Sequence, residues 1–245
     1  MTHGALAPHF SIGVTAITSS STYAFQPSAG ELVLNAYARC GIRGPELAAQ
    51  HLADAATECN LLAVQFSNRN PNAWMMETPT IPLVQGQAVY NLPTRTIAIG
   101  IAYLTVGTGA SAFDTPMGPI SATDWGAIAT KNTQGQPTTI FLNLQNPIPT
   151  ITLWPVPDDN DYVINVQSFR QMQDVGLKNG ESLDAPYRFL DAFTAGLAAR
   201  LSRIYAPALY QVRSADFESA FQEAAARDQQ DVALYITPGL SAYYR

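Results

Sequence analysis

The residues of this chain that could carry acid–base, nucleophilic or metal chemistry are few and scattered. Its histidines are His3, His9 and His51, and none lies in the HExxH pattern that places two zinc ligands on one helical face. Its two cysteines, Cys40 and Cys59, have neither a CxxC spacing nor a histidine beside them. These patterns favour structural roles, with His51 as an ordinary helix residue and both cysteines as small buried side chains.

An acidic segment, Asp158–Asp161, has the composition of a calcium loop but lacks its spacing. An EF-hand loop needs alternating oxygen ligands, a glycine at its sixth position and a glutamate at its twelfth. Counted from Asp159, these positions hold Ile164 and Arg170. We interpret the segment as an acidic turn joining two strands, with adventitious cation binding as the weaker alternative.

Motifs for nucleotide and ester chemistry do not occur either. The run Gly107–Gly109 is too short for a GxGxxG dinucleotide fingerprint, and the sequence contains no GxxxxGK[ST] and no GxSxG. Asp54 with Glu58, or Glu218 with Glu223, could form a glycosidase pair, but at helical spacing such carboxylates usually lie on a solvated face. The sequence therefore predicts no catalytic residue, no metal site and no cofactor.

Charge is unusually sparse in this chain. Charged residues make up 13% of its 245 residues, against roughly 25% in an ordinary soluble domain. Apolar residues make up 47%, so the low charge does not indicate disorder. The net charge is −6 and only Lys131 and Lys178 are lysines. Because nucleic-acid binders need clustered basic residues to neutralise phosphates, this composition argues against that class.

Membrane insertion and secretion are not expected. No apolar run approaches the roughly 20 residues of a membrane-spanning helix. The start of the chain, Met1–Pro8, lacks the positive charge and apolar centre of a signal peptide. We expect a soluble protein with no membrane partner.

Helical patterns dominate the N-terminal third of the chain. Ser28 and Glu31 fit a capping box, and Gly41 is placed to end the first helix in a left-handed conformation. Gly44–Glu46 restarts a helix with a proline at its first turn, and this helix of about 22 residues closes before Asn70. Its apolar stripe consists of Ala48, Leu52, Ala55, Ala56, Cys59, Leu62, Ala63 and Phe66.

A β-rich texture follows, in which prolines and glycines separate short β-branched and aromatic runs. The predicted strands are Thr80–Val84, Ala88–Leu92, Ile97–Val106, Thr138–Leu144, Thr150–Trp154 and Tyr162–Phe169. Gly86-Gln87 is predicted to be a hairpin turn between the first two. Ser121–Thr130 is predicted to be a short helix.

Helical periodicity returns after Leu183–Pro186. Phe189, Leu190, Phe193, Leu197, Leu201 and Ile204 line one face of the next predicted helix. Ala206-Pro207 interrupts it, and a second long helix starts at Pro207. The end of the chain, Tyr235–Arg245, is apolar, aromatic and unpatterned, so we expect it to contact a partner.

These elements predict an α+β fold: a bundle of an N-terminal and a C-terminal helix pair, with a β-rich domain inserted between the pairs. Residues 1–27 form an extended arm in this interpretation, although a short edge strand over Phe10–Ile17 stays open. The helical domain comprises residues 28–77 and 178–234, the inserted domain residues 78–177, and the tail residues 235–245.

Arginine gathers toward the C-terminus, with seven of eleven at or after residue 170. Arginine can pair bidentately with carboxylates at interfaces. Two interpretations stay open for Arg200, Arg203, Arg213 and Arg227: pairing within the helices of one chain, or pairing between subunits.

Several segments, in this order, resemble one known family. They are Leu34–Gly44, Glu46–Ala55, Trp74, Met117–Trp125, Ile128, Lys131, Gly135–Pro137, Ile151–Pro157 with its Leu-Trp-Pro-Val-Pro run, and Pro186-Tyr187. The chain from about Glu31 to Leu234 is similar to the head-to-tail adaptor of short-tailed bacteriophages, also called tail accessory factor or head completion protein. The N-terminal arm is a departure, since many relatives start near the first helix.

The resemblance implies a structural virion protein, not an enzyme, that forms a ring of usually twelve copies beneath the portal. The ring would extend the DNA channel, help to retain the genome and provide a platform for the tail nozzle or fibres, after assembly in the host cytoplasm. The tail would engage the portal, through Tyr235, Ile236, Leu240, Tyr243, Tyr244 and Arg245.

The composition agrees with contact in passing between the protein and double-stranded DNA. A lysine-poor acidic chain does not hold phosphates tightly, and twelve copies would carry a net charge of about −72. The alternative is a receptor- or glycan-binding tail module, in which Trp74, Trp125 and Trp154 would stack on sugars. A cell-wall hydrolase is supported only by the scattered carboxylates.

Overall fold

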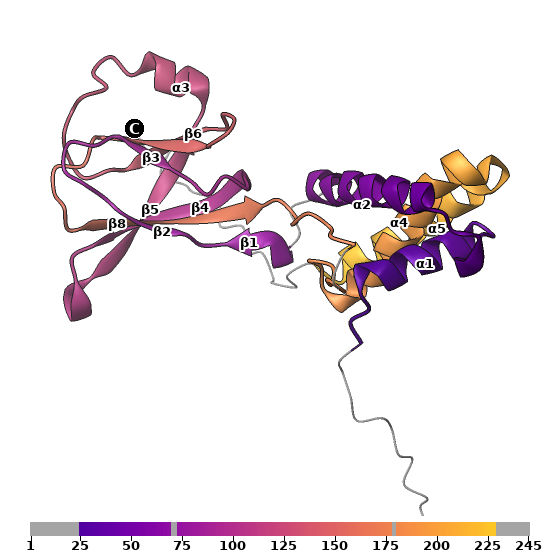
Figure 1. Ribbon diagram of the computed structural model, residues 1–245. Coiled ribbons are helices and arrows are strands. Elements are labelled where there is room, and N and C mark those ends of the chain that lie inside the picture. The colour runs from indigo at the N-terminus through magenta and orange to yellow at the C-terminus, as the bar shows by residue number, and fades with distance from the viewer. Residues whose placement is uncertain (1–24, 70–72, 178–179, 229–245) are drawn as a thin grey trace, which may run out of the picture.

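The computed structural model describes residues 25–69, 73–177 and 180–228. It is an α+β structure in which helices from both ends of the chain pack together and an eight-stranded curled sheet is inserted between them (Figure 1). The sheet lies at one end of the molecule and the helices lie at the other. Most of the predicted arm, residues 1–24, and the predicted tail lie outside the described residues.

The first helix, α1 (Ala29–Arg39), begins and ends as predicted. The Ser28 hydroxyl accepts the backbone N–H of Glu31, and the Glu31 carboxylate accepts the backbone N–H of Ser28 at 2.8 Å. Each contact satisfies an amide that the first helical turn leaves unpaired. Gly41 has a φ of +89°, the left-handed conformation that ends many helices.

The next helix, α2 (Ala49–Arg69), ends where it was predicted to end but starts later. Gly44–Glu46 forms a separate turn of 3₁₀ helix, and Leu47 then adopts an extended conformation with a ψ of 122°. The prediction that Pro45 starts the long helix was therefore wrong. The carboxylate of Glu46 accepts the Arg43 N–H and completes that turn locally, so the chain restarts only at Ala49.

All six predicted strands are present, and two more complete the sheet. The strands are β1 (Met76–Glu77), β2 (Thr80–Pro82), β3 (Val89–Asn91), β4 (Thr96–Val106), β5 (Phe113–Ile120), β6 (Thr139–Asn143), β7 (Thr150–Trp154) and β8 (Tyr162–Arg170). Their order is β1-β8-β4-β5-β6-β7-β3, with β2 also beside β8. The short helix α3 (Ala122–Ala127) follows β5 and is capped by Ser121. It ends before the predicted Thr130, because Ile128 adopts an extended conformation with a ψ of 114°.

The predicted hairpin at Gly86-Gln87 was wrong in its pairing. The turn exists, with a φ of +81° at Gly86, but β2 pairs with β8 and β3 pairs with β7. The Gly86 amide donates to the Pro157 carbonyl at 2.8 Å. The turn is therefore held by the loop between β7 and β8. The turn therefore carries the chain from one side of the curled sheet to the other.

The C-terminal helices are α4 (Leu190–Tyr205) and α5 (Tyr210–Ala226), each preceded by one 3₁₀ turn, Tyr187–Phe189 and Pro207–Leu209. Helix α4 is the centre of the bundle, since eleven of its sixteen residues are buried against α1, α2 and α5. The predicted apolar face is buried from Phe189 to Leu201, whereas Ile204 is half exposed.

Two features of the bundle core depend on close packing. The ring of Phe66 on α2 lies 5.1–6.1 Å from four other phenylalanine rings, those of Phe189, Phe193, Phe217 and Phe221. A Cβ atom added at Gly196 would lie 2.9 Å from the ring of Phe217 and 3.0 Å from Leu62. Glycine at this position lets α2 and α5 both approach α4 closely.

Candidate functional site

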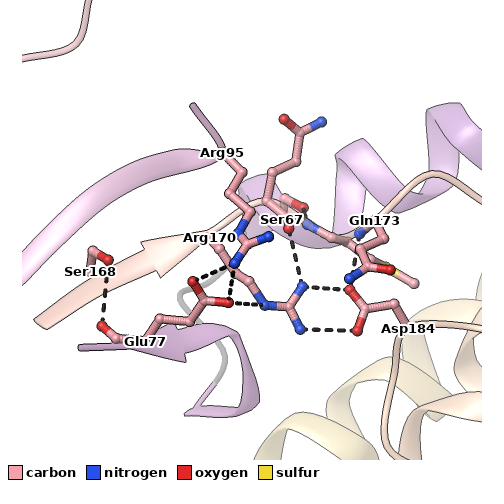
Figure 2. A network of polar contacts seen from close by, with 9 residues as sticks. Ser67, Glu77, Arg95, Ser168, Arg170, Gln173 and Asp184 are labelled. Atoms are coloured by element: carbon pink, nitrogen blue, oxygen red, sulfur yellow. Dashed lines mark hydrogen bonds and ion pairs between the residues drawn. The ribbon is translucent and has the colours of Figure 1, made fainter. Parts of the chain in front are cut away.

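The structure brings charged residues together where the sheet meets the helices. Arg170 is the last residue of β8, and its guanidinium lies between two carboxylates (Figure 2). It pairs bidentately with Asp184, at 2.5 and 2.9 Å, and its Nε donates to Glu77 of β1 at 3.1 Å. We call this cluster, with Arg95, the junction network.

Arg95 completes the junction network from the turn before β4. Its Nη2 lies 3.0 Å from both carboxylate oxygens of Glu77, so Glu77 receives two guanidinium groups. The Arg170 guanidinium also lies 5.8 Å from the ring centre of Trp74, which packs against the helical core. The network therefore joins both chain crossings between the sheet and the bundle.

The contacts within the junction network keep Asp184 and Arg170 in their charged forms. Burial acts to raise the pKa of Asp184, but hydrogen bonds from Arg170 and the Gln173 amide and the charges of Arg170 and Arg95 outweigh it. The pKa of Asp184 therefore lies below its ordinary value. The hydrogen bond to Asp184 raises the pKa of Arg170 in turn. Both groups are charged at neutral pH.

The segment that leaves β8 is also fastened to α2. The Ser67 hydroxyl accepts the Met172 amide at 3.0 Å, and the Asn60 side chain accepts the Val175 amide at 2.8 Å. Backbone groups that would otherwise be buried without partners are thus satisfied by side chains of a helix. The connection from the sheet to the bundle is therefore held both by the junction network and by polar side chains of α2.

Sequence reasoning did not find the junction network. It counted Arg170 among the C-terminal arginines, but it did not single out Glu77 or Arg95. A usable signal is the position of these residues, because Glu77 and Arg95 shortly precede expected strands and Arg170 directly follows one.

Two of the arginines proposed to pair between subunits have partners within the chain. Arg200 on α4 pairs with Glu58 of α2 at 2.9 Å and donates to Gln65 at 2.9 Å. Arg213 pairs with Asp216 one turn along α5 at 2.8 Å. Pairing of either residue between subunits remains a prediction.

The other two arginines are exposed. Arg203 lies 4.9 Å from the ring centre of Tyr210 and donates to its hydroxyl at 3.2 Å. Arg227 follows the last residue of α5, and within residues 25–69, 73–177 and 180–228 no ion pair of its side chain is found. The predicted portal-binding residues Tyr235, Ile236, Leu240, Tyr243, Tyr244 and Arg245 lie outside the described residues.

Two of the residues considered for catalysis, His51 and Asp54, contact other helices of the bundle. The His51 ring stacks on Tyr205 at 4.6 Å between ring centres, the Tyr37 hydroxyl donates to the His51 carbonyl, and the Tyr205 hydroxyl donates to Asp54. This cluster fastens α1, α2 and α4 to one another. His51 is an ordinary helix residue here, as the sequence predicted.

Both cysteines are buried and free, as predicted. Burial raises the pKa of Cys59 to about 12, so its thiol stays protonated and unreactive at neutral pH. Among the described residues no group of three His, Cys, Asp or Glu side chains is placed to hold a metal ion. None of the helices in the described ranges has the length and apolar character needed to cross a membrane.

The three tryptophans are engaged in contacts within the chain. Trp74 packs on the helical core, and Trp125 of α3 stacks on Phe141 with ring centres 5.6 Å apart. The indole N–H of Trp154 donates to the Thr130 carbonyl at 3.1 Å. Stacking on a sugar needs an open aromatic face, and Phe141 already covers one face of Trp125.

Comparison with protein families gives one finding. The family model described as SU10 adaptor protein matches residues 28–240, most of the chain. The match begins at Ser28, the capping residue of α1. No curated protein matches the chain.

Proposed function

Because this chain belongs to the SU10 adaptor family, whose members are phage head-tail adaptors, we propose that it forms a ring beneath the portal of a phage virion. The ring, of usually twelve copies, extends the DNA channel and helps to retain the packaged genome. It also provides the attachment platform for the tail nozzle or tail fibres. Copies made in the host cytoplasm join the virion at the head-to-tail interface.

Family membership is the observation that carries this proposal, and the architecture supports it. The helices and the sheet are separate parts joined by a polar junction, so that two surfaces of one subunit can serve two sets of neighbours. In this proposal the bundle contacts neighbouring copies and the portal, and the sheet faces the tail. The protein has a structural and not an enzymatic role.

The charge of the chain also supports a channel role. A net charge of −6 with only two lysines disfavours tight binding to phosphates. DNA that must move rapidly through a ring requires walls that do not hold it. The protein therefore meets DNA in passing, without recognising its sequence.

The proposal is tested by mixing the purified protein with portal rings of the same phage and imaging the product by electron microscopy. A ring stacked coaxially on the portal is the expected result. Absence of any complex, together with saturable binding to a surface glycan, would overturn the proposal in favour of a receptor-binding module.

A further inference from the structure

Strand β4 has one side without a neighbouring strand over half of its length. β8 pairs with β4 from Thr96 to Val106, whereas β5 pairs only with Ala102–Val106. Within residues 25–69, 73–177 and 180–228, no other strand pairs with Thr96–Ile101. The backbone N–H and C=O groups on the outer side of this stretch can therefore accept a further strand. We call this stretch the β4 edge.

The β4 edge is uncharged and partly apolar. Ile101 is 66% exposed, more than any other large aliphatic side chain in the described ranges. Proteins protect such edges with charges, prolines, bulges or a covering segment. The β4 edge has two shifts of register against β8 but neither a charge nor a proline, and the shift between Ile99 and Ala102 leaves Ile101 in solvent. A covering segment is therefore expected.

A hollow of about 320 Å³ lies beside the first residues of the β4 edge. Its lining includes Thr96 and Ile97 and most of the loop between β6 and β7. The lining residues carry no charge, and Leu144 of that loop is 56% exposed. The space beside the edge is thus open, and its walls suit an uncharged, partly apolar occupant.

The N-terminal segment Phe10–Ile17 has the pattern of such an occupant. It carries no charge, and its apolar and polar residues alternate as in a strand with one buried face: Phe10, Ile12, Val14 and Ala16 against Ser11, Gly13 and Thr15. Eight extended residues cover about 26 Å, enough for the six residues of the β4 edge. The segment lies outside both the described residues and the family match over residues 28–240, so it is a feature of this chain.

The start of α1 lies near the β4 edge. Ser28 pairs with Ser182 in an isolated β-bridge. Asp184, two residues further along, pairs with Arg170, and Arg170 lies opposite Thr96 in the ladder. These contacts place the backbone of Ser28 within about 30 Å of Thr96.

We propose that Phe10–Ile17 adds an antiparallel strand to the β4 edge of the same chain. The eleven residue steps from Ile17 to Ser28 span up to about 36 Å when extended, so Ile17 can reach Thr96. Phe10 then lies toward Ile101, which sets the antiparallel direction. The added strand supplies ladder hydrogen bonds to the open side of β4 and brings apolar side chains beside Ile101. This inference goes beyond the proposed function and does not depend on the ring.

The first test breaks the proposed strand within the full-length chain. Successive N–H groups of a strand point to opposite sides, so Val14→Pro/Thr15→Pro removes a hydrogen bond to β4 in either register. Ser20→Pro/Ser21→Pro is the matched control, because it changes the same arm outside the segment. Hydrogen exchange measured by NMR should show the outward amides of Thr96–Ile101 exchanging at least about tenfold faster in Val14→Pro/Thr15→Pro than in the wild type.

The control variant should exchange as the wild type does at the β4 edge. Tyr103–Val106 lies between β5 and β8, so its amides should stay equally slow in all three proteins and show that the sheet remains folded. Equal exchange of the β4 edge in the wild type and in both variants would overturn the inference. Equal acceleration in the two variants would overturn it as well.

The second test supplies the strand from outside. A synthetic peptide of residues 9–18 should slow exchange at the β4 edge of Val14→Pro/Thr15→Pro. The peptide should bind the wild type at least about tenfold more weakly, because the chain's own segment occupies the edge. Equal binding to both proteins would overturn the inference. Slow exchange of the wild-type edge only at high protein concentration would show that a second copy supplies the segment, and would overturn pairing within one chain. Neither test uses portal rings, so a failure here leaves the proposed function standing.

Discussion

Arg170, the last residue of β8, and Asp184, in the segment leading to α4, form a bidentate ion pair with nitrogen–oxygen distances of 2.5 and 2.9 Å. The side chains are 13% and 22% exposed, so solvent screens the pair only in part. Glu77 binds the same guanidinium from the other chain crossing. One arginine therefore links both chain crossings between the sheet and the bundle.

Replacing Arg170 with methionine should destabilise the protein. The change leaves Asp184 partly buried without its guanidinium partner, which should lower the free energy of unfolding by about 1–3 kcal/mol. Urea unfolding followed by circular dichroism measures the loss. The control is Arg203→Met, since Arg203 is exposed, and its effect should stay within about 0.5 kcal/mol. Equal losses for the two variants would contradict a special role for the junction network.

The protein should lose stability in acid. The pKa of Asp184 lies below its ordinary value of 3.8, and a hydrogen bond from Arg69 lowers the pKa of Glu218 below 4.5. A carboxyl with a lower pKa in the folded chain stabilises the fold above its unfolded pKa, and that contribution is lost as pH falls through the folded value.

Melting temperatures measured across a pH series should therefore hold down to pH 4.5 and fall below it. Asp184→Asn should show a shallower decline than the wild type, because one of the titrating groups is gone. A rise in melting temperature below pH 4.5 would contradict this assignment.

Gly196→Ala should destabilise the bundle although alanine favours helix. The added Cβ would lie 2.9 Å from the Phe217 ring and 3.0 Å from Leu62, so α2 or α5 must shift. Overpacking of this kind costs about 1–3 kcal/mol. Gly126→Ala on α3 is the matched control, because its Cβ meets no atom within 4 Å. Chemical denaturation should separate the two variants, and a stabilised Gly196→Ala protein would refute the close approach.

Neither cysteine thiol should react with thiol reagents in the folded protein. Cys40 is 6% exposed and Cys59 is 1% exposed, and burial raises the pKa of both thiols. Titration with Ellman's reagent at pH 8 should detect no thiol per chain until denaturant is added, and two thereafter. Rapid labelling of either cysteine in the native protein would mean that the helices around it open.

Elements stabilised by residues close together in the chain were predicted correctly. The capping box at Ser28, the end of α2 before Asn70 and the strand Thr150–Trp154 each have a recognisable signal in neighbouring residues. Strand β5 was missed because Pro116 and Pro119 interrupt it and its burial does not alternate. Both features remove the local signals of a strand.

Features that depend on distant parts of the chain could not be predicted. The pairing of β2 with β8 joins residues about eighty positions apart, and no local pattern specifies that register. The same holds for the pair of Arg170 with Glu77, and for Arg200 with Glu58, which are 142 positions apart. Composition predicted that arginines would pair with carboxylates, but only the fold decides which partners meet.

The pairing of β1 with β8 has a consequence for how such a protein can change. The chain enters the sheet at Met76 and leaves it at Arg170, and Met76 lies opposite Phe169 in the ladder. The bundle is therefore connected to the insert by a single double-stranded stem. Segments of the sheet beyond that stem can be lengthened, shortened or exchanged without changing how the helices pack. The inserted sheet could thus diverge in sequence and size while the helical bundle stayed as it was.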